Sequence, residues 1–204
     1  METKEQVRSR VLARRDALPE YVRARKSAAI CAQVEQTLAE ALSGMEAGAG
    51  APTVAAFASM RSEVDMRAFV ESAFDRGWSI CFPCMVRDEE GQPSQMAFYR
   101  VEHEQLEAAR AKFLDTPLRC LPCAALEQAG FRVAAPEELD AVIVPLVAFD
   151  DAGRRLGYGG GNYDQLLPRL RANSVVIGVG FDEQRVETVP CELHDVALPR
   201  VVSG

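Results

Sequence analysis

The spacing of apolar residues at the start of the chain predicts two helices. Residues 4–17 form the first helical segment, and Pro19 ends it because proline lacks the N–H group that a helix interior requires. Residues 20–42 form the second, in which apolar side chains recur every four positions. The glycine-rich stretch 44–52 then predicts a loop, since glycine and proline interrupt regular structure. The apolar stripe of the second helix consists of Ile30, Val34, Leu38 and Leu42.

Strand-like and helix-like segments alternate from residue 53 onward, in the order typical of an α/β protein. Asp65 is the expected N-cap of the first helix in this part, and the β-branched run 141–145 is typical of a strand buried on both faces of a parallel sheet. Residues 102–138 show some helical character and no clear order of elements. Because neither a repeat nor a linker divides the sequence, we expect a single domain over residues 1–204. The predicted strands are 53–59, 78–83, 96–101, 141–145 and 174–180, and the predicted helices are 65–76 and 163–171.

Composition and charge narrow the class of protein. The 204 residues are 48% hydrophobic and 26% charged, as in ordinary globular proteins, and the net charge of −7 argues against nucleic-acid binding. The first 26 residues carry eight basic and four acidic side chains, and this local excess suits a small anion. The apolar run 141–149 is far shorter than the ~20 residues that cross a bilayer. The first residues also lack the apolar core of a secretory signal, so we expect a cytoplasmic protein with mostly reduced cysteines and no membrane partner.

The segment RRLGYGGGNYD, residues 154–164, carries the strongest signal for chemistry. Its four glycines allow the backbone to turn several N–H groups toward one point, which is how anion-binding loops form. Arg155 is suited to grip phosphate oxygens, Asp164 offers a hard oxygen ligand for Mg²⁺, and the helix that follows presents its N-terminal dipole. The segment is not a Walker A loop, because it contains no Gly-Lys-Ser/Thr. It is not a G-x-G-x-x-G motif either, because Asn162 stands at the last glycine position.

Two C-x-x-C pairs, Cys81/Cys84 and Cys120/Cys123, raise the question of a structural zinc site. Their separation is wider than that of a usual zinc ribbon, and Cys81 falls on a predicted buried strand, where cysteine behaves as a small apolar residue. We therefore favour inert thiols over a zinc site or a redox pair.

The run LDAVIVPLVAFDDAGRRLGYGGGNYDQLL, residues 139–167, resembles the signature region of 5-formyltetrahydrofolate cyclo-ligases, also called methenyltetrahydrofolate synthetases. Further segments occur in that family's order, and together they span nearly the whole chain. These segments are ARKSAAI (24–30), SMRSEVD (59–65), CFP (81–83), QMAFYR (95–100) and PCELHD (190–195).

The resemblance implies a Rossmann-like α/β fold, with a mostly parallel sheet flanked by helices, of the kind shared with certain sugar-phosphate isomerases and CoA transferases. It also implies a ligase of one-carbon metabolism that uses ATP and Mg²⁺ to convert 5-formyltetrahydrofolate to 5,10-methenyltetrahydrofolate. In that reaction ATP phosphorylates the formyl oxygen, N10 attacks the activated carbon, and phosphate leaves. The partners are then two small molecules, folate and ATP, and we expect a monomer.

The resemblance assigns site residues as well. The implied catalytic residues are Arg155, Tyr163 and Asp164, and the implied metal ligands are Asp164 and Asp195. The implied ATP-binding residues are Lys4, Arg8, Arg155, Gly157, Tyr158, Gly159, Gly160, Gly161, Asn162 and Tyr163. The implied folate-binding residues are Ala58, Met60, Glu63, Tyr158, Gly159, Gly160, Gly161 and Asn162, with Phe57 as a further apolar wall. Lys4 and Arg8, spaced i, i+4, share one helical face.

The sequence departs from the family pattern at two places. Asn162 replaces the first tyrosine of the usual Gly-Tyr-Tyr-Asp, so one aromatic face is lost. Residues 111–138 also diverge. These departures leave two alternatives: a folate- or nucleotide-binding homologue without turnover, and a sugar-phosphate isomerase-like enzyme of related fold that uses the anion site without ATP.

Overall fold

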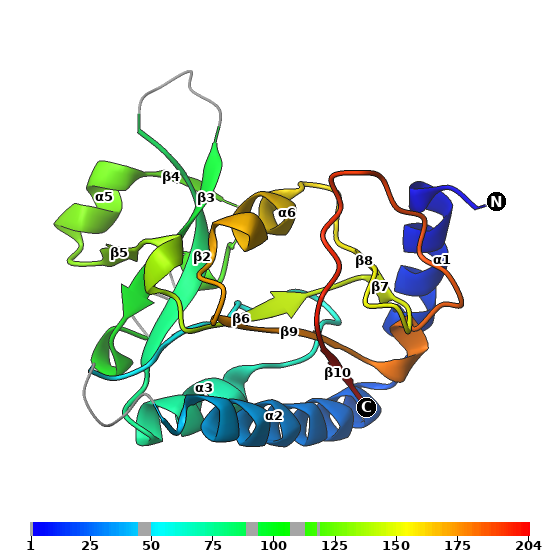
Figure 1. The fold of residues 1–204 in the computed structure, drawn as a ribbon, viewed down its shortest axis with the longest axis horizontal. Coiled ribbons are helices and arrows are strands. Elements are labelled where there is room, and N and C mark those ends of the chain that lie inside the picture. Colours follow the sequence, from blue (N-terminus) through cyan, green and yellow to red (C-terminus); the bar gives the residue numbers. More distant parts are fainter. Residues whose placement is uncertain (1, 45–49, 89–93, 107–112, 118) are drawn as a thin grey trace.

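The computed structural model describes residues 2–44, 50–88, 94–106, 113–117 and 119–204. Figure 1 shows a central twisted sheet with helices on both sides. This arrangement confirms the α/β fold, with a mostly parallel sheet flanked by helices. Within the described part of the chain, no helix is both long enough and apolar enough to span a membrane.

The two N-terminal helices lie where the apolar spacing predicts them. Helix α1 (Lys4–Asp16) begins at Thr3, whose side chain accepts the Gln6 N–H while the Gln6 side chain accepts the Thr3 N–H. Helix α2 (Glu20–Leu42) places its entire apolar stripe in the core, each member at most 1% exposed. Burial of such a side chain stabilises the fold by about 1.5–3 kcal/mol, so α2 is held by packing. The predicted loop 44–52 lies mostly outside the described residues.

The main sheet has the strand order β10-β9-β6-β1-β2-β3-β5, with β4 paired to β2. Strands β10, β9, β6, β1 and β2 run parallel, whereas β3 pairs antiparallel with both β2 and β5. Strands β7 and β8 form a separate antiparallel pair. The strands are β1 (Thr53–Ala55), β2 (Ser79–Arg87), β3 (Gln95–Val101), β4 (Cys120–Pro122), β5 (Arg132–Ala134), β6 (Ala141–Pro145), β7 (Ala148–Phe149), β8 (Arg155–Leu156), β9 (Val175–Gly180) and β10 (Val201–Ser203).

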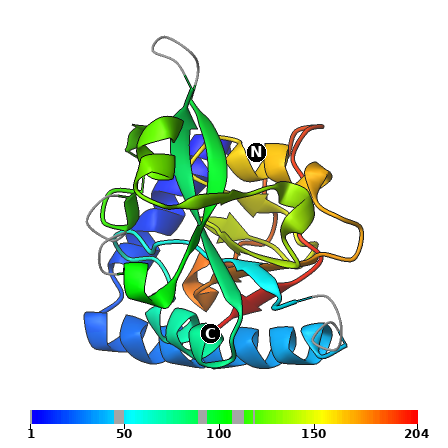
Figure 2. The same cartoon turned by 90° about the vertical axis from the view of Figure 1, so that its left-hand side faces the viewer.

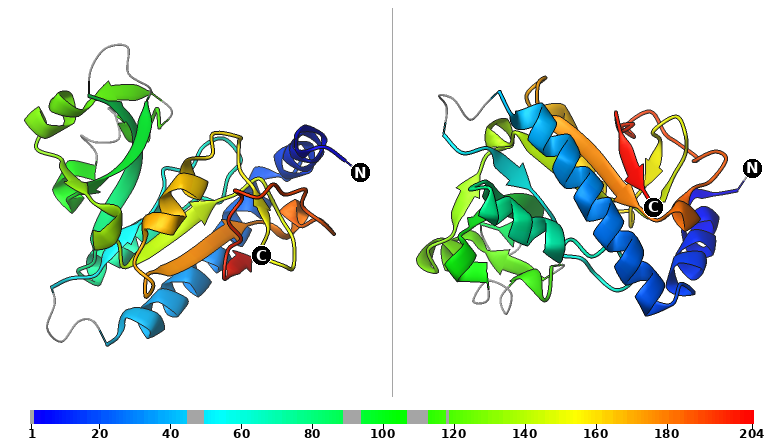
Figure 3. Two further views of the ribbon diagram at one scale, coloured as in Figure 1. Left: turned by 45° about the horizontal axis from the view of Figure 1, so that its top comes forward. Right: turned by 90° about the horizontal axis from the view of Figure 1, so that it is seen from below.

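Helices cover the two faces of the sheet unequally. Helix α2 and helix α3 (Arg67–Asp75) lie along one face, and helix α6 (Asn162–Leu166) lies on the other (Figures 1 and 3). The long pair β2 and β3 crosses most of the height of the view in Figure 2. At this end of the main sheet, β4 pairs with β2, β5 pairs with β3, and helix α5 (Cys123–Gln128) follows β4. Helix α1 packs on β7 and β8 through Val7, Val11 and Leu156. The positively charged N-terminal helix is thereby fixed beside the loop that follows β8.

The strand predicted over 53–59 and the helix predicted over 65–76 have different bounds in the structure. The strand predicted over 53–59 ends at Ala55, because the chain leaves the sheet there and continues as an irregular segment over residues 56–66. Asp65 is not the N-cap of α3, which is Met66. The Asp65 carboxylate nevertheless accepts the Arg67 N–H at 3.1 Å, so it still binds a donor of the first turn.

Proline explains two further differences. Strand β2 continues past Pro83 to Arg87, since pairing with β1 ends at Cys81 and pairing with β4 begins only at Met85. The helix predicted over 163–171 is only α6 followed by a 3₁₀ turn (Leu167–Arg169), because Pro168 has no N–H to continue the α-helical bonds. The described parts of 102–138 contain β4, α5 and β5, with 3₁₀ turns at His103–Gln105 and Pro136–Glu138.

Candidate active site

The site is a cavity of about 370 Å³ beyond the carboxyl ends of β1 and β6. Ligands of open α/β sheets gather at this edge. The structure brings to this one cavity every residue that the sequence analysis names for binding or catalysis. They are Lys4, Arg8, Phe57, Ala58, Met60, Glu63, Arg155, Gly157, Tyr158, Gly159, Gly160, Gly161, Asn162, Tyr163, Asp164 and Asp195.

The glycine-rich loop, residues 157–161, forms one wall of the cavity. Gly159 and Gly161 have φ angles of 106° and 65°, in the region that favours glycine over all other residues. The Arg8 Nε donates a 2.7 Å hydrogen bond to the carbonyl oxygen of Gly157, so helix α1 holds the start of the loop. Because α6 has only five residues, its dipole is small, and an anion here would rely on side-chain cations and loop N–H groups.

Arg155 and Asp164 form an ion pair at the base of the loop. The Arg155 NH2 group lies 2.9 Å from Asp164 Oδ1, and the two side chains are 5% and 23% exposed. The same carboxylate oxygen accepts the Val196 N–H at 3.0 Å, while the Arg155 NH1 group donates to the Val196 carbonyl oxygen. This pair therefore joins β8, α6 and the C-terminal segment, residues 190–198.

Lys4 holds the other end of the C-terminal segment. Its Nζ atom lies 2.6 Å from Asp195 Oδ2 and 3.2 Å from Glu192 Oε2. Burial disfavours the Lys4 charge, but the hydrogen bonds that Lys4 donates to Asp195 and Glu192, together with the charges of these carboxylates, outweigh it and raise the pKa of Lys4. Burial likewise opposes the Asp195 charge, but the hydrogen bonds that Asp195 accepts from Lys4 and from the Glu192 N–H, together with the Lys4 charge, outweigh it and lower the pKa of Asp195.

Glu63 is the buried carboxyl group of the cavity. It lies on segment 56–66, is 7% exposed, and its Oε2 accepts the Met60 N–H at 2.8 Å. Its Oε1 is buried without a hydrogen-bond partner among the described residues. Burial raises the pKa of Glu63, and this effect outweighs the Met60 N–H, the Arg15 charge, the Tyr158 hydroxyl and the Arg61 charge, which all lower it. A buried acceptor without a donor is costly, and a ligand N–H would remove that cost.

Two tyrosines approach Glu63 from the other side. The Tyr163 hydroxyl is buried without a hydrogen-bond partner among the described residues, and burial raises its pKa. Tyr158 is 43% exposed in the cavity, and its hydroxyl accepts a 2.9 Å hydrogen bond from Arg15. Between them in sequence, the Asn162 Nδ2 lies 3.6 Å from the Met85 sulfur, so this side chain folds onto the loop and β2.

Sequence reasoning missed three residues of this region. Glu192 and His194 line the cavity beside Asp195, and the ligand atoms of these three side chains lie within 4.8 Å of one another. Asp164 is not in that group, so its pairing with Asp195 as a metal ligand stays a prediction. Arg15 is buried against the cavity wall, and its i+7 spacing from Arg8 was the available signal.

Cys84 lies near Cys120 and Cys123, whose charges help to raise its pKa, whereas Cys81 lies apart on the opposite face of the sheet. Cys81 packs in the core cluster on one face of the sheet and Cys84 in the cluster on the other, because strand neighbours three apart point in opposite directions. Burial raises the pKa of Cys81 to about 12 and that of Cys84 to about 11. Both thiols are therefore protonated at neutral pH.

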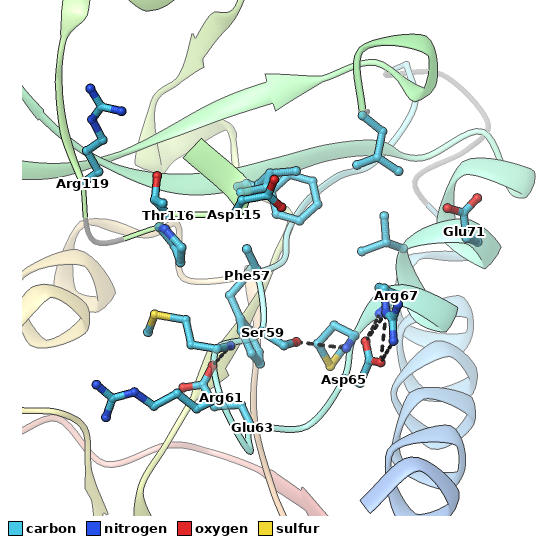
Figure 4. A pocket seen from close by; sticks show the side chains of 18 residues that line it. Phe57, Ser59, Arg61, Glu63, Asp65, Arg67, Glu71, Asp115, Thr116 and Arg119 are labelled. Atoms are coloured by element: carbon cyan, nitrogen blue, oxygen red, sulfur yellow. Dashed lines mark hydrogen bonds and ion pairs between the residues drawn. The ribbon is translucent and has the colours of Figure 1, made fainter. Parts of the chain in front are cut away.

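A second cavity, of about 700 Å³, adjoins the first through a shared wall. Phe57, Met60 and Glu63 line both cavities. Figure 4 shows Arg61 and Glu63 on segment 56–66, with Asp115, Thr116 and Arg119 on the opposite side. Segment 56–66 therefore separates two connected spaces, and Glu63 stands between them.

The fold and the site define an α/β protein whose glycine-rich loop lines a cavity with Lys4, Arg8 and Arg155 at the carboxyl edge of its sheet. The model of the 5-formyltetrahydrofolate cyclo-ligase family matches residues 1–204. The chain is 29% identical over 203 residues to a 5-formyltetrahydrofolate cyclo-ligase of Mycolicibacterium smegmatis, with 98% of this chain and 93% of that protein covered. It is 31% identical over 154 residues to the Escherichia coli (strain K12) protein of the same name, with 75% and 78% covered.

Solved structures agree in fold. A 5,10-methenyltetrahydrofolate synthetase from Mycoplasma pneumoniae matches with a TM-score of 0.72 at 19% identity, covering 98% of both chains. One from Aquifex aeolicus matches with a TM-score of 0.63 at 22% identity, covering 98% of this chain and 89% of that chain. The chain belongs to the 5-formyltetrahydrofolate cyclo-ligase family, and by this membership it is an enzyme of the ligase class.

Proposed function

We propose that this protein converts 5-formyltetrahydrofolate to 5,10-methenyltetrahydrofolate with ATP and Mg²⁺, releasing ADP and phosphate, as a cytoplasmic monomer of one domain. The proposal rests on two buried polar atoms that have no hydrogen-bond partner among the described residues, Glu63 Oε1 and Tyr163 Oη. They lie in one cavity with Lys4, Arg8 and Arg155. This combination offers a polar pocket for a heterocycle beside a cationic pocket for phosphates.

The cationic side suits the triphosphate of ATP. Phosphoryl transfer depends mainly on positioning and charge neutralisation, so cations and loop N–H groups are the main requirement. We assign Lys4, Arg8 and Arg155 to the phosphates, together with the glycine-rich loop. Arg8 and Arg155 are already held by Gly157 and Asp164, and this limits the ordering cost when the nucleotide binds.

The polar pocket suits the pterin of the folate. A pterin presents a ring N–H and an amino group, and an ionised Glu63 accepts from both kinds of donor. Met60, Ala58 and Phe57 supply an apolar wall beside that carboxylate, and Tyr158 and Tyr163 lie across from it. The second cavity continues from the shared wall, so space for the rest of an elongated substrate is present.

The reaction has two steps. The formyl oxygen attacks the γ-phosphorus of ATP, the bond to the β-phosphate oxygen breaks, and ADP leaves. N10 then attacks the activated formyl carbon, the carbon–oxygen bond breaks with departure of phosphate, and the N10 proton is lost as the methenyl cation forms. Arg155 neutralises charge on the transferring group.

Mg²⁺ fits the donors present. This ion prefers oxygen ligands and commonly takes one or two protein carboxylates together with substrate phosphates. Asp195 and Asp164 are carboxylates on two sides of the cavity, and Glu192 adds another oxygen donor. When bound, the ion would neutralise phosphate charge.

The test is the long-wavelength absorbance of the methenyl product during incubation with 5-formyltetrahydrofolate and Mg²⁺, with and without ATP. We expect a rise that needs ATP and disappears when a chelator removes Mg²⁺. No rise, beside an active control enzyme, would refute the proposal, and folate binding without turnover would favour a binding protein instead. A rise without ATP would refute the nucleotide role.

A further inference from the structure

A buried arginine that touches neither proposed substrate connects the parts of the site. Arg15, near the end of α1, is 1% exposed. Its Nε donates to Ser62 Oγ at 2.9 Å and its NH2 donates to the Tyr158 hydroxyl at 2.9 Å. Its guanidinium carbon lies 5.9 Å from the centre of the Tyr158 ring. One side chain thus contacts both segment 56–66 and the glycine-rich loop.

The fold alone compensates this buried charge poorly. The two hydrogen-bond acceptors of Arg15 are neutral, and its NH1 has no partner among the described residues. The carboxylate of Asp16 is 3.8 Å away and 58% exposed, so solvent screens much of that attraction. A buried cation whose charge is only partly compensated costs stability. The contribution of Arg15 to stability therefore does not explain its buried position.

The conformation of segment 56–66 depends on this contact. Arg61 has a φ of 53°, a strained left-handed value for a residue that is not glycine. The next residue, Ser62, accepts from Arg15 and donates to Asp16, so its hydroxyl is bound on both sides. Glu63 follows directly. Arg15 therefore fixes the turn from which the Glu63 carboxyl group enters the cavity.

We propose that Arg15 is a positioning residue for the folate half of the site, which fixes the Tyr158 ring and the Ser62–Glu63 turn and keeps a positive charge facing Glu63. This inference rests on the proposed function. It predicts that Glu63 meets the pterin as a carboxylate and in one orientation, and that the phosphate half of the site depends less on Arg15.

The electrostatic part has a clear sign. Burial raises the pKa of Glu63, and the Arg15 charge lowers it. The other charged or titratable groups that face Glu63 are Arg61 on its own segment, Tyr158 on the glycine-rich loop and Tyr163 on α6. Without the Arg15 charge the pKa of Glu63 would rise further. Folate binding that needs the carboxylate would then be lost at a higher pH.

The test compares Arg15→Met, Arg15→Lys and the control Arg10→Gln, which removes an exposed arginine of the same helix. The readouts are KM for each substrate, the Kd for 5-formyltetrahydrofolate against pH by calorimetry, and Tm. For Arg15→Met we expect a rise of about tenfold in KM for folate, equivalent to ~1.4 kcal/mol, because Ser62 and Tyr158 lose their shared donor, with KM for ATP little changed. As the pH is lowered, Arg15→Met should lose folate affinity at a higher pH than the wild type does. Arg15→Lys should restore the wild-type pH dependence of Kd but not the wild-type KM for folate. Arg10→Gln should match the wild type in both quantities.

A purely structural role gives a different result. If Arg15→Met lowers Tm but leaves the pH dependence of Kd unchanged, or raises both KM values equally, the inference is overturned. If Arg15→Met does not fold, Ser62→Ala removes one acceptor and should raise KM for folate a few-fold without changing KM for ATP; an unchanged KM for folate would overturn the inference. A wild-type protein that binds folate without turnover would refute the proposed function, while the pH dependence of Kd would still test Arg15.

Discussion

Arg155 and Asp164 lie 2.9 Å apart where β8 and α6 face each other across the glycine-rich loop, and the Arg155 side chain is 5% exposed. The pair has two consequences. It stabilises the junction between the loop and the C-terminal segment, and it holds a cation and a carboxylate in the cavity. Removing Asp164 leaves the buried Arg155 charge without its carboxylate partner.

Asp164→Asn should abolish most turnover while the fold persists. The amide keeps the shape of the carboxylate and can still accept the Val196 N–H, but it loses the charge opposite Arg155. We expect kcat to fall at least about a hundredfold, which is the usual effect of removing one protein group that stabilises charge in the transition state. Asp164→Ala should in addition lower the free energy of unfolding by about 2–3 kcal/mol, below the range for fully buried pairs because Asp164 is partly exposed.

Urea unfolding and the absorbance assay measure the two effects separately. Asp151→Asn is the control, since it removes the exposed Asp151–Arg185 ion pair near the same strands. Wild-type turnover in Asp164→Asn would contradict the assigned role.

Lys4→Met should raise KM for ATP by about tenfold, which corresponds to the loss of ~1.4 kcal/mol of phosphate binding. Lys4 also holds Asp195 and Glu192, so the C-terminal segment should become more accessible to protease. Lys26→Met is the matched control, because Lys26 pairs with Glu183 at 3.0 Å and does not line the cavity. Equal changes of KM in the two variants would show that ion-pair loss alone is responsible.

Glu63→Gln should stabilise the fold at alkaline pH and weaken folate binding. The folded-state pKa of Glu63 lies above its ordinary value, mainly because of burial, so ionisation in the folded protein costs stability that is present at acidic pH and lost as pH rises. The amide removes this cost. Each ~1 kcal/mol gained would raise Tm by about 2–4 °C at about pH 8, with little difference near pH 4.

Folate binding provides the opposite readout for the same variant. KM for folate should rise about 10- to 100-fold, since an amide cannot accept from two pterin donors as a carboxylate does. Glu40→Gln, on the exposed side of α2, should change neither quantity. A variant with unchanged KM would remove Glu63 from the folate site.

Asn162→Tyr should lower KM for folate by about two- to tenfold, because an added aromatic contact contributes about 0.5–1.5 kcal/mol. The present Asn162 folds onto Gly160 and Met85, so the ring must point into the cavity instead. Steady-state kinetics measure the change, and KM for ATP serves as the internal reference. A rise in KM for folate would mean that the asparagine itself binds substrate.

Much of the fold follows from local pattern. The four-residue apolar spacing of α2 predicts the one face that this helix buries. The β-branched run of β6 predicts a strand that is buried on both faces. The exceptions have tertiary causes. Strand β1 stops at Ala55 although the sequence stays apolar, because its continuation lines the cavity, and helix α6 is short because Pro168 follows it.

Periodicity and glycine content are local properties, so they were enough to predict the α/β class, the long helices and the glycine-rich loop flanked by Arg155 and Asp164. Which distant side chains meet depends on the folded chain. The pairing of Lys4 with Asp195, the orphaned Glu63 oxygen and the burial of Arg15 all depend on contacts between residues far apart in sequence. Such contacts follow from how the helices pack on the sheet, and a single sequence does not encode them in any local spacing.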